Sequence, residues 1–287
     1  MGAQDVTGTQ HQSDRIGLGI GLATIGDNTV DQYFGAEQTS FVGGNAVNVA
    51  VKLRTLGNDV AYAGAVGPDA DGERIRRTLQ DEGVDTSLLV DLPGITSVSR
   101  IRVEDDGERV IFFEDFATSA DYRPDEDALD ALAARRLVHI GMNPFADEIR
   151  RGLRARGVLV TQDCAVSSGF ADLDVAFCSA GDDRAGAERL AREAVAGGAS
   201  LAVVTCGPAG SIAFDGERWW EAAAQPIDVV DTTGAGDSYI AGFVDRFARG
   251  EDIQTCMTEG SRVAALTCQH WGGFEQVPQI VREGAGA

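Results

Sequence analysis

The sequence predicts an α/β protein with a doubly wound, mostly parallel sheet flanked by helices. Patterns typical of buried strands alternate with patterns typical of amphipathic helices from about residue 124 onward. Glycine makes up 36 of the 287 residues, nearly twice the average of about 7%, and is spread along the chain, as many tight strand-to-helix turns require. With 44% hydrophobic residues, the chain can form a sizeable core.

The length suits about two average domains or one large α/β domain, and we expect a single domain over residues 18–287. Residues 1–17 are polar and show no hydrophobic period, so we expect a mobile tail there. We find no internal repeat.

Acidic residues outnumber basic ones by 45 to 24, which gives a formal net charge of -21. This field repels nucleic acids and anionic membranes, so we expect neither as a partner. The absence of a signal-peptide pattern and of an apolar run of about 18 residues favours a cytoplasmic protein. The cysteines are odd in number and include no Cys-x-x-Cys pair, which argues against a disulfide framework or a zinc site. They are Cys164, Cys178, Cys206, Cys256 and Cys268.

The first predicted strand, Leu18–Ile25, interleaves apolar residues with Gly and Ala and ends just before Asp27. Ligands of open α/β sheets bind beyond such carboxyl ends. A strand-like stretch at Ser40–Val42 is followed by Gly43 and Gly44, which lead into a helix ending at Leu56 before a glycine.

The next part of the chain predicts a strand at Val60–Val66, a turn at Gly67–Gly72 and a helix at Glu73–Glu82. Two strand patterns, Ser97–Val103 and Val110–Phe113, are then separated by a polar turn. They predict a hairpin outside the βα rhythm, with one face of the sheet buried.

The βα alternation returns in the second half, where His139 falls in a strand without Cys or His neighbours at ligand spacing. We therefore expect His139 to be a packed core residue. The predicted elements are helix Asp125–Ala134, strand Leu137–Ile140, helix Ala146–Arg156, strand Val158–Asp163, strand Val175–Cys178, helix Arg184–Ala196 and strand Leu201–Thr205.

The stretch Asp231–Ser238 predicts a glycine-rich loop that opens into a helix, because apolar residues follow it at helical spacing. The first amides of a helix have no intrahelical partner, and its dipole places partial positive charge there. The amides of Gly234, Ala235 and Gly236 therefore predict a site for a phosphate or another anion.

Asp237 lies in the first turn of this predicted helix. A carboxylate beside a bound sugar can accept the proton of a hydroxyl while that oxygen attacks a phosphoryl group. Taken alone, an aspartate at this position is usually an acid that only stabilises the helix N-terminus.

The run Asp231–Phe243 resembles the C-terminal signature of the ribokinase-like (PfkB-type) sugar kinases, and Gly43–Val51 resembles their N-terminal signature. The two occur in the family's order, and the resemblance extends over roughly Leu22–Pro278. It implies an ATP-dependent kinase that phosphorylates a sugar hydroxyl, with Asp237 as the catalytic base. The anion hole implied by the resemblance consists of Gly234, Ala235 and Gly236.

The resemblance further implies a sugar site and a small β-sheet lid over it, with strands around residues 30–42 and 96–116. Such a lid excludes water, and in the family it often forms a homodimer contact. The sugar-binding residues implied are Asp27, Asp31, Gly43, Gly44, Asn45 and Asn48.

The loop Thr205–Gly210 resembles the family's nucleotide loop, which implies that Thr205, Gly207 and Gly210 contact ATP. Without the resemblance, this loop is simply a turn between two strands. A second nucleotide contact is expected at Gly272 and Gly273.

Two ion sites are also implied. Asp183 occupies the place of the glutamate in the family's Asn-x-x-Glu motif and is expected to reach Mg²⁺ through water, although Ala180 replaces the motif's amide. The backbone at Asp231 and Thr233 is the expected site of a monovalent cation such as K⁺.

Within the family, Ile25–Asp31 and Phe41–Val51 are most similar to fructoselysine 6-kinases, which implies a fructosamine substrate phosphorylated on its 6-hydroxyl. A kinase of fructose, another sugar or a nucleoside would also retain Asp237. A non-catalytic sugar-binding protein on the same fold is the alternative of another class, and the intact helix-start motif argues against it. A nicotinamide-dependent enzyme would need Gly-x-Gly-x-x-Gly directly after the first strand, and this chain lacks it there.

Overall fold

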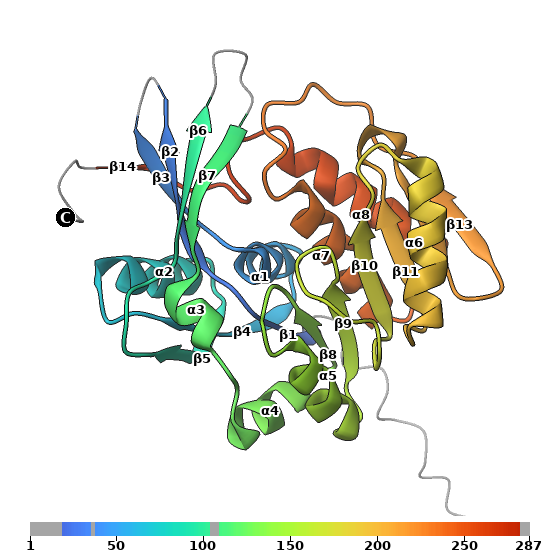
Figure 1. Ribbon diagram of the computed structural model, residues 1–287, viewed down its shortest axis with the longest axis horizontal. Helices are drawn as coiled ribbons and strands as arrows, with labels where there is room; N and C mark the ends of the chain where they lie inside the picture. The colour runs from blue at the N-terminus through green and yellow to red at the C-terminus, as the bar shows by residue number, and fades with distance from the viewer. Residues whose placement is uncertain (1–18, 36–37, 104–108, 282–287) are drawn as a thin grey trace, which may run out of the picture.

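The computed structural model describes residues 19–35, 38–103 and 109–281 (Figure 1). The tail predicted at 1–17, Leu18 of the first predicted strand and the turn predicted at Asp105–Gly107 lie outside the described residues.

A nine-stranded sheet forms the centre of the fold, in the order β13-β12-β11-β10-β9-β8-β1-β4-β5. The strands from β11 to β5 pair in parallel, and β12 and β13 add an antiparallel edge. The predicted mostly parallel sheet is therefore confirmed. The strands are β1 Gly21–Ile25, β4 Asp59–Val66, β5 Asp85–Asp91, β8 Leu137–Ile140, β9 Leu159–Asp163, β10 Val175–Ser179, β11 Ala202–Thr205, β12 Ser211–Phe214 and β13 Trp219–Ala222.

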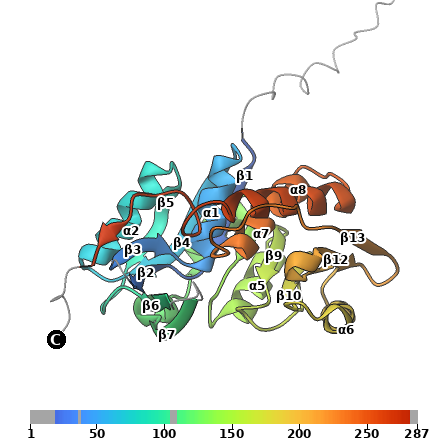
Figure 2. The same ribbon diagram turned by 90° about the horizontal axis from the view of Figure 1, so that it is seen from above.

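Helices cover both faces of this sheet (Figure 2). Leu22 of β1 packs in the apolar cluster on one face, and its neighbours Ala23 and Ile25 pack in the cluster on the other. The first face carries α1 Asn45–Thr55, α2 Ala70–Asp81, α7 Ala235–Ala248 and α8 Ile253–Thr267, and the second carries α4 Glu126–Ala133, α5 Ala146–Ala155 and α6 Arg184–Ala196.

The strand order reverses at β1, because the chain first proceeds to β4 and β5 on one side and later to β8, β9 and β10 on the other. In doubly wound sheets such a switch point leaves a crevice at the carboxyl ends of the strands, and ligands bind there.

A second, five-stranded sheet projects beside this crevice, in the order β14-β3-β2-β6-β7 (Figure 1). Four of its strands lie where the lid strands are predicted, and β6 and β7 form the predicted hairpin, whereas β14 lies outside the predicted ranges. They are β2 Thr29–Phe34, β3 Thr39–Gly43, β6 Val98–Val103, β7 Arg109–Asp115 and β14 Gln279–Ile280. The short helix α3 Ala117–Asp121 follows β7.

The structure differs from the expected elements at two places that have clear physical reasons. Helix α2 begins at Ala70, three residues before the predicted Glu73, because the Asp69 carboxylate accepts the Gly72 amide hydrogen and caps the helix. Strand β5 is not predicted, since Leu89 is its only buried side chain and its other residues give no strand-like alternation.

The described residues contain no helix that is both long enough and apolar enough to span a bilayer. All five cysteines are free thiols. His139 is fully buried, and its Nδ1 lies 3.0 Å from the Thr161 hydroxyl, which confirms the expected core position. Burial lowers the pKa of His139 to about 3.

Asp69 joins α2 to the segment that leads into the small sheet. Its Oδ1 accepts from the Gly72 amide and from the Thr96 hydroxyl, and its Oδ2 accepts from the Thr96 amide. Burial acts to raise the pKa of Asp69, but these hydrogen bonds outweigh it and the net shift is downward.

Asp69→Ala should lower the free energy of unfolding by about 1–2 kcal/mol, as measured by urea denaturation at pH 7. Because the folded pKa is depressed, this stabilisation is present above the ordinary Asp pKa and disappears as the pH falls through the folded value. Asp125, which caps α4 with a single exposed hydrogen bond, provides the matched control. An equal loss for Asp125→Ala, or a loss at Asp69 that persists at pH 2, would contradict this account.

Candidate functional site

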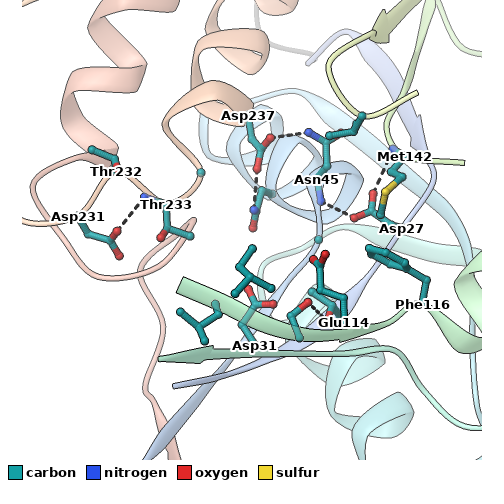
Figure 3. A pocket seen from close by; sticks show the side chains of 18 of the residues that line it. Asp27, Asp31, Asn45, Glu114, Phe116, Met142, Asp231, Thr232, Thr233 and Asp237 are labelled. Carbon is teal, nitrogen blue, oxygen red and sulfur yellow. Dashed lines mark hydrogen bonds between the residues drawn. The ribbon is translucent and has the colours of Figure 1, made fainter. Parts of the chain in front are cut away.

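A cavity of about 850 Å³ lies between the carboxyl end of β1, the start of α1, the start of α7 and the small sheet (Figure 3). Five carboxylates line it, and no Lys, Arg or His of the described residues does. Apolar side chains complete its wall. The acids are Asp27, Asp31, Glu114, Asp231 and Asp237, and the apolar residues are Ile101, Ile111, Phe116, Met142, Val166, Val229 and Val230.

The start of α7 has the geometry of an anion site. Gly234 is the N-cap with φ 72°, a left-handed conformation that glycine adopts without strain. The Ala235 amide donates to the Thr232 carbonyl at 3.1 Å, so it is partly engaged, contrary to the expectation that it is free. The amides of Gly236 and Asp237 have no acceptor among the described residues and stay available for an anion.

Asp237 projects from this first turn toward α1 (Figure 3). Its Oδ1 accepts a hydrogen bond from Asn45 Nδ2 at 2.6 Å, and its Oδ2 accepts one from Asn48 Nδ2 at 2.7 Å. Residues three apart share one face of a helix, so both amides reach the same carboxylate. The asparagines predicted as sugar ligands therefore also orient Asp237.

The pKa of Asp237 is raised to about 8. Burial is the largest cause, and the charges of Asp163 and Asp27 add to it, while the hydrogen bonds from Asn48 and Asn45 oppose it. In its ionised form, which predominates only above about pH 8, a carboxyl with this pKa is a stronger proton acceptor than an ordinary aspartate.

Asp27 serves the backbone as well as the cavity. Its Oδ2 accepts from the Asn45 amide at 2.8 Å, and its Oδ1 accepts from the amides of Ala46 and Met142. Burial raises the pKa of Asp27, and these hydrogen bonds oppose the shift. Asp27 thus connects the start of α1 to the loop after β8 and also lines the cavity.

Asp31, Ser99 and Glu114 form a row across the small sheet, because Asp31 pairs with Ser99 and Ser99 pairs with Glu114. The row faces Asp237 across the cavity (Figure 3). Burial, followed by the charges of Asp27 and Glu114, raises the pKa of Asp31 to about 7.

Glu114 was not among the residues predicted from the sequence. The register between β6 and β7 shifts between Arg100 and Ile101. Because of this irregularity, both Ile111 and Glu114 line the cavity although they are three positions apart on the strand. Strict alternation along β7 places these two residues on opposite faces, so the pattern alone gives no signal for Glu114.

Gly43 and Gly44 hold the backbone close to these acids. Gly44 lines the cavity with φ 109°, and a Cβ added at Gly43 would lie 2.2 Å from Asp31 Oδ2. Any side chain at Gly43 would displace that carboxylate, so this glycine is required for the close approach of β3 to Asp31.

A second cavity, of about 640 Å³, lies on the other side of the start of α7. Thr205, Gly207 and Gly210 line it, as expected of a nucleotide loop, together with Ala235 and Gly236. Thr232 and Val229 line both cavities. The start of α7 is therefore the point at which the two cavities meet.

Gly272 and Gly273, expected at the nucleotide, do not line this second cavity. The Gly272 amide donates to Asp231 Oδ2 at 2.8 Å, and Asp231 Oδ1 accepts from the Thr233 amide. Gly273 packs against Gly234 and Asn48. In this structure the two glycines therefore contact the residues that lead into α7 and stabilise the start of that helix.

Asp183 does not line either cavity. It is the N-cap of α6, and its Oδ1 accepts from the Gly186 amide at 2.8 Å. Over the described ranges, no three acid, cysteine or histidine side chains gather in a way that could hold a metal ion. The site for Mg²⁺ at Asp183 and the site for K⁺ at Asp231 and Thr233 stay predictions.

Known proteins resemble this chain along most of its length. A model described as the pfkB family carbohydrate kinase matches residues 29–176 and 168–280. A fructoselysine 6-kinase of Shigella flexneri is 35% identical over 266 residues, covering 88% of this chain and 99% of the relative. A fructosamine kinase of Bacillus subtilis is 28% identical, covering 88% of this chain and 92% of the relative. The solved structure of Arabidopsis thaliana ribokinase with ribose and ATP superposes with a TM-score of 0.79 at 21% identity, covering 89% and 94% of the two chains.

Gly273→Ala should destabilise the protein by about 1–3 kcal/mol, since the added Cβ would lie 2.4 Å from Asn48 Oδ1. Gly21→Ala is the control, because its Cβ would meet only the Arg135 side chain at 3.6 Å, and we expect a change within about 0.5 kcal/mol. Denaturant unfolding measures both. Equal stability of the two variants would show that Gly273 does not pack as described.

Proposed function

The chain belongs to the pfkB family of carbohydrate kinases, and we propose that its acceptor is a fructosamine such as fructoselysine, phosphorylated on the 6-hydroxyl. As a member of this family it is a phosphotransferase that acts on the hydroxyl group of a sugar. The remaining questions are how its residues carry out the transfer and which sugar they select.

The two cavities suit the two substrates of such a transfer. We assign the sugar to the cavity that contains Asp237 and ATP to the cavity lined by Thr205, Gly207 and Gly210. Because the start of α7 borders both, a γ-phosphoryl group in the second cavity and a hydroxyl in the first could meet there. This arrangement provides the proximity on which phosphoryl transfer mainly depends.

In this mechanism Asp237 is the general base. Asn45 and Asn48 hold both of its carboxylate oxygens, which restricts the carboxyl to one orientation at the edge of the sugar cavity. As the sugar oxygen attacks the phosphorus, its proton passes to Asp237. The raised pKa of Asp237 makes this carboxylate a stronger proton acceptor than an ordinary aspartate.

The amides at the start of α7 stabilise the charge on the phosphoryl group in transit. Gly236 and Asp237 supply unpartnered N–H groups, and the helix dipole adds partial positive charge at the same point. These local dipoles are needed because the net charge of -21 repels a nucleotide. When bound with the nucleotide, Mg²⁺ would neutralise phosphate charge, and a water-mediated contact through Asp183 suits an ion that usually keeps several waters.

The observation that supports a fructosamine, rather than a neutral sugar, is the charge of the sugar cavity. Asp31 and Glu114 face it from β2 and β7, the strands on either side of β6, and no basic side chain of the described part of the chain lines the cavity. Arg74, which does not line it, offsets the charge of Asp31 only in part. Taking the Asp31 carboxylate out of water beside other acids is costly, and a bound cation reduces that cost; Glu114 is exposed and adds negative charge at the same wall. The amine of a fructosamine is protonated near neutral pH and provides such a cation.

Fructose, another ketose or a nucleoside would use the same base and the same anion hole. They would leave Asp31 and Glu114 without a cation in the cavity, so we expect them to be poorer acceptors.

A homodimer through the small sheet would bring further groups to the lid. The exposed apolar side chains along β7 suit such a contact, and they are Val110, Ile111, Phe112 and Phe113.

The direct test is ATP consumption with fructoselysine, other fructosamines, fructose, ribose and adenosine, compared by kcat/KM. We expect fructosamines to exceed fructose at least about tenfold, the value of one charge-assisted contact. Asp237→Asn should lower kcat with the best acceptor by about 10² to 10⁴ while ATP affinity, measured by calorimetry, changes little. Equal use of fructose and fructoselysine would reject the fructosamine assignment, and undiminished kcat in Asp237→Asn would reject the base.

Glu114→Gln should raise KM for fructoselysine about tenfold and leave KM for fructose unchanged, because only the fructosamine carries the ammonium group. Glu148→Gln is the matched control, since Glu148 pairs with Arg123 away from the cavity. An equal rise of KM for both sugars would mean that Glu114 shapes the cavity without recognising the amine.

A further inference from the structure

One buried acid outside the sugar cavity is connected to the proposed base. Asp163 lies at the end of β9, its side chain is 8% exposed, and it does not line either of the two cavities. Its Oδ1 accepts from the Ala165 amide at 2.9 Å, and its Oδ2 accepts from Asn45 Nδ2 at 2.8 Å. The same nitrogen donates to Asp237 Oδ1 at 2.6 Å.

The side-chain amide of Asn45 therefore bridges two carboxylates, one from β9 and one from α7. An amide nitrogen carries two hydrogens, and both are used here. The orientation of the amide is determined by its neighbours, since both carboxylates are acceptors and only the NH₂ end can face them. Asn45 Oδ1 is buried and has no hydrogen-bond partner among the described residues, and it lies against Gly141.

An unpartnered buried oxygen costs free energy, so the amide would rotate if another orientation could satisfy both ends. The two acids prevent that rotation. Removing the acceptor at Asp163 would release one hydrogen of the amide and with it the constraint on the other. The alignment of Asp237 thus depends on a residue that does not contact the sugar cavity.

We propose that Asp163 is a positioning residue that acts through Asn45 to hold Asp237 in its catalytic orientation. The proposal rests on the assignment of Asp237 as the base. It adds a second role to Asn45, which the family resemblance implies only as part of the sugar site.

The groups next to Asp237 come from three elements, and Asp31 and Glu114 of the small sheet face it from across the cavity. Asp163 approaches from β9 and Asp27 from the end of β1, while α1 contributes the neutral amides of Asn45 and Asn48. The Asp163 and Asp27 charges both raise the pKa of Asp237, after burial as the largest cause. Burial also raises the pKa of Asp163, to about 6, so Asp163 is ionised at neutral pH.

The charge of Asp163 determines the direction in which the pKa of Asp237 should change in a variant. A negative charge at Asp163 disfavours the ionised form of Asp237, so removal of that charge lowers the pKa of Asp237. The acid limb of the kcat/KM profile of Asp163→Asn should therefore move to lower pH by about one unit. As the pH falls through about 6, Asp163 becomes protonated in the wild type, and the two profiles should converge.

Asp163→Asn keeps one acceptor oxygen, which can face Asn45 when the Ala165 hydrogen bond is given up, whereas Asp163→Ala removes both acceptors. We expect kcat at pH 9 to fall less than about tenfold in Asp163→Asn and about 10- to 100-fold in Asp163→Ala, since misplacement of a catalytic group is costly. Asp174→Asn is the control. Asp174 also accepts a backbone amide near β9, from Val160, but it contacts Arg154 and no residue of the site. Its pH profile should match the wild type.

A second readout does not depend on turnover. The carboxyl ¹³C shift of Asp237, followed by NMR titration of the protein without substrates, should show a midpoint near 8 in the wild type and a lower one in Asp163→Asn. An unmoved midpoint together with an unmoved acid limb would overturn the proposal, even if kcat fell. If Asp237→Asn kept full activity, the base assignment itself would fail, and that result is distinct from a failure at Asp163.

Discussion

Three carboxylates, those of Asp27, Asp163 and Asp237, converge on the first turn of α1, and the hydrogen-bond donors of that turn allow them to lie together. Buried like charges repel one another and lose their hydration. Asn45 opposes both costs, because its backbone amide donates to Asp27 and its side-chain amide donates to the other two acids. Asn48 adds a further hydrogen bond to Asp237. The burial and the repulsion that these hydrogen bonds do not offset raise the pKa of Asp237. A raised pKa strengthens a carboxylate as a proton acceptor, which the proposed role as general base requires.

The scaffold brings these groups together because the strand order reverses at β1. Asp27 follows β1 and Asp163 ends β9, so both lie at the carboxyl edge of the sheet, where α1 also begins. Helix α7 then places the partial positive charge of its first turn between the two cavities. In the proposed function, this single helix N-terminus divides the crevice of the doubly wound sheet into a site for the sugar and a site for ATP.

Selectivity and catalysis involve the same electrostatics at different walls of one cavity. At the α1 wall, amide donors compensate the acids and orient the base. At the wall formed by the small sheet, Asp31 and Glu114 have no basic neighbour lining the cavity among the described residues. In the proposed function, the protonated amine of the sugar supplies the missing charge at that wall. A cationic sugar would then match a cavity whose lining groups in the described residues are all neutral or acidic.

Local sequence was sufficient for the mostly parallel sheet, for the loop that opens α7 and for the place of Asp237 in the first turn of that helix, since strand periodicity and the glycine-rich helix start are properties of neighbouring residues. The tertiary structure decided what periodicity does not encode. Glu114 reaches the cavity through a register irregularity between two strands, and Asp163 reaches Asp237 only through an amide from a helix far away in sequence. Gly273 supports the start of α7 instead of facing the nucleotide cavity. The contacts of Asn45 with Asp163 and Asp237, and of Gly273 with Asn48, join residues more than a hundred positions apart, and only the packing of complete elements determines which of them meet.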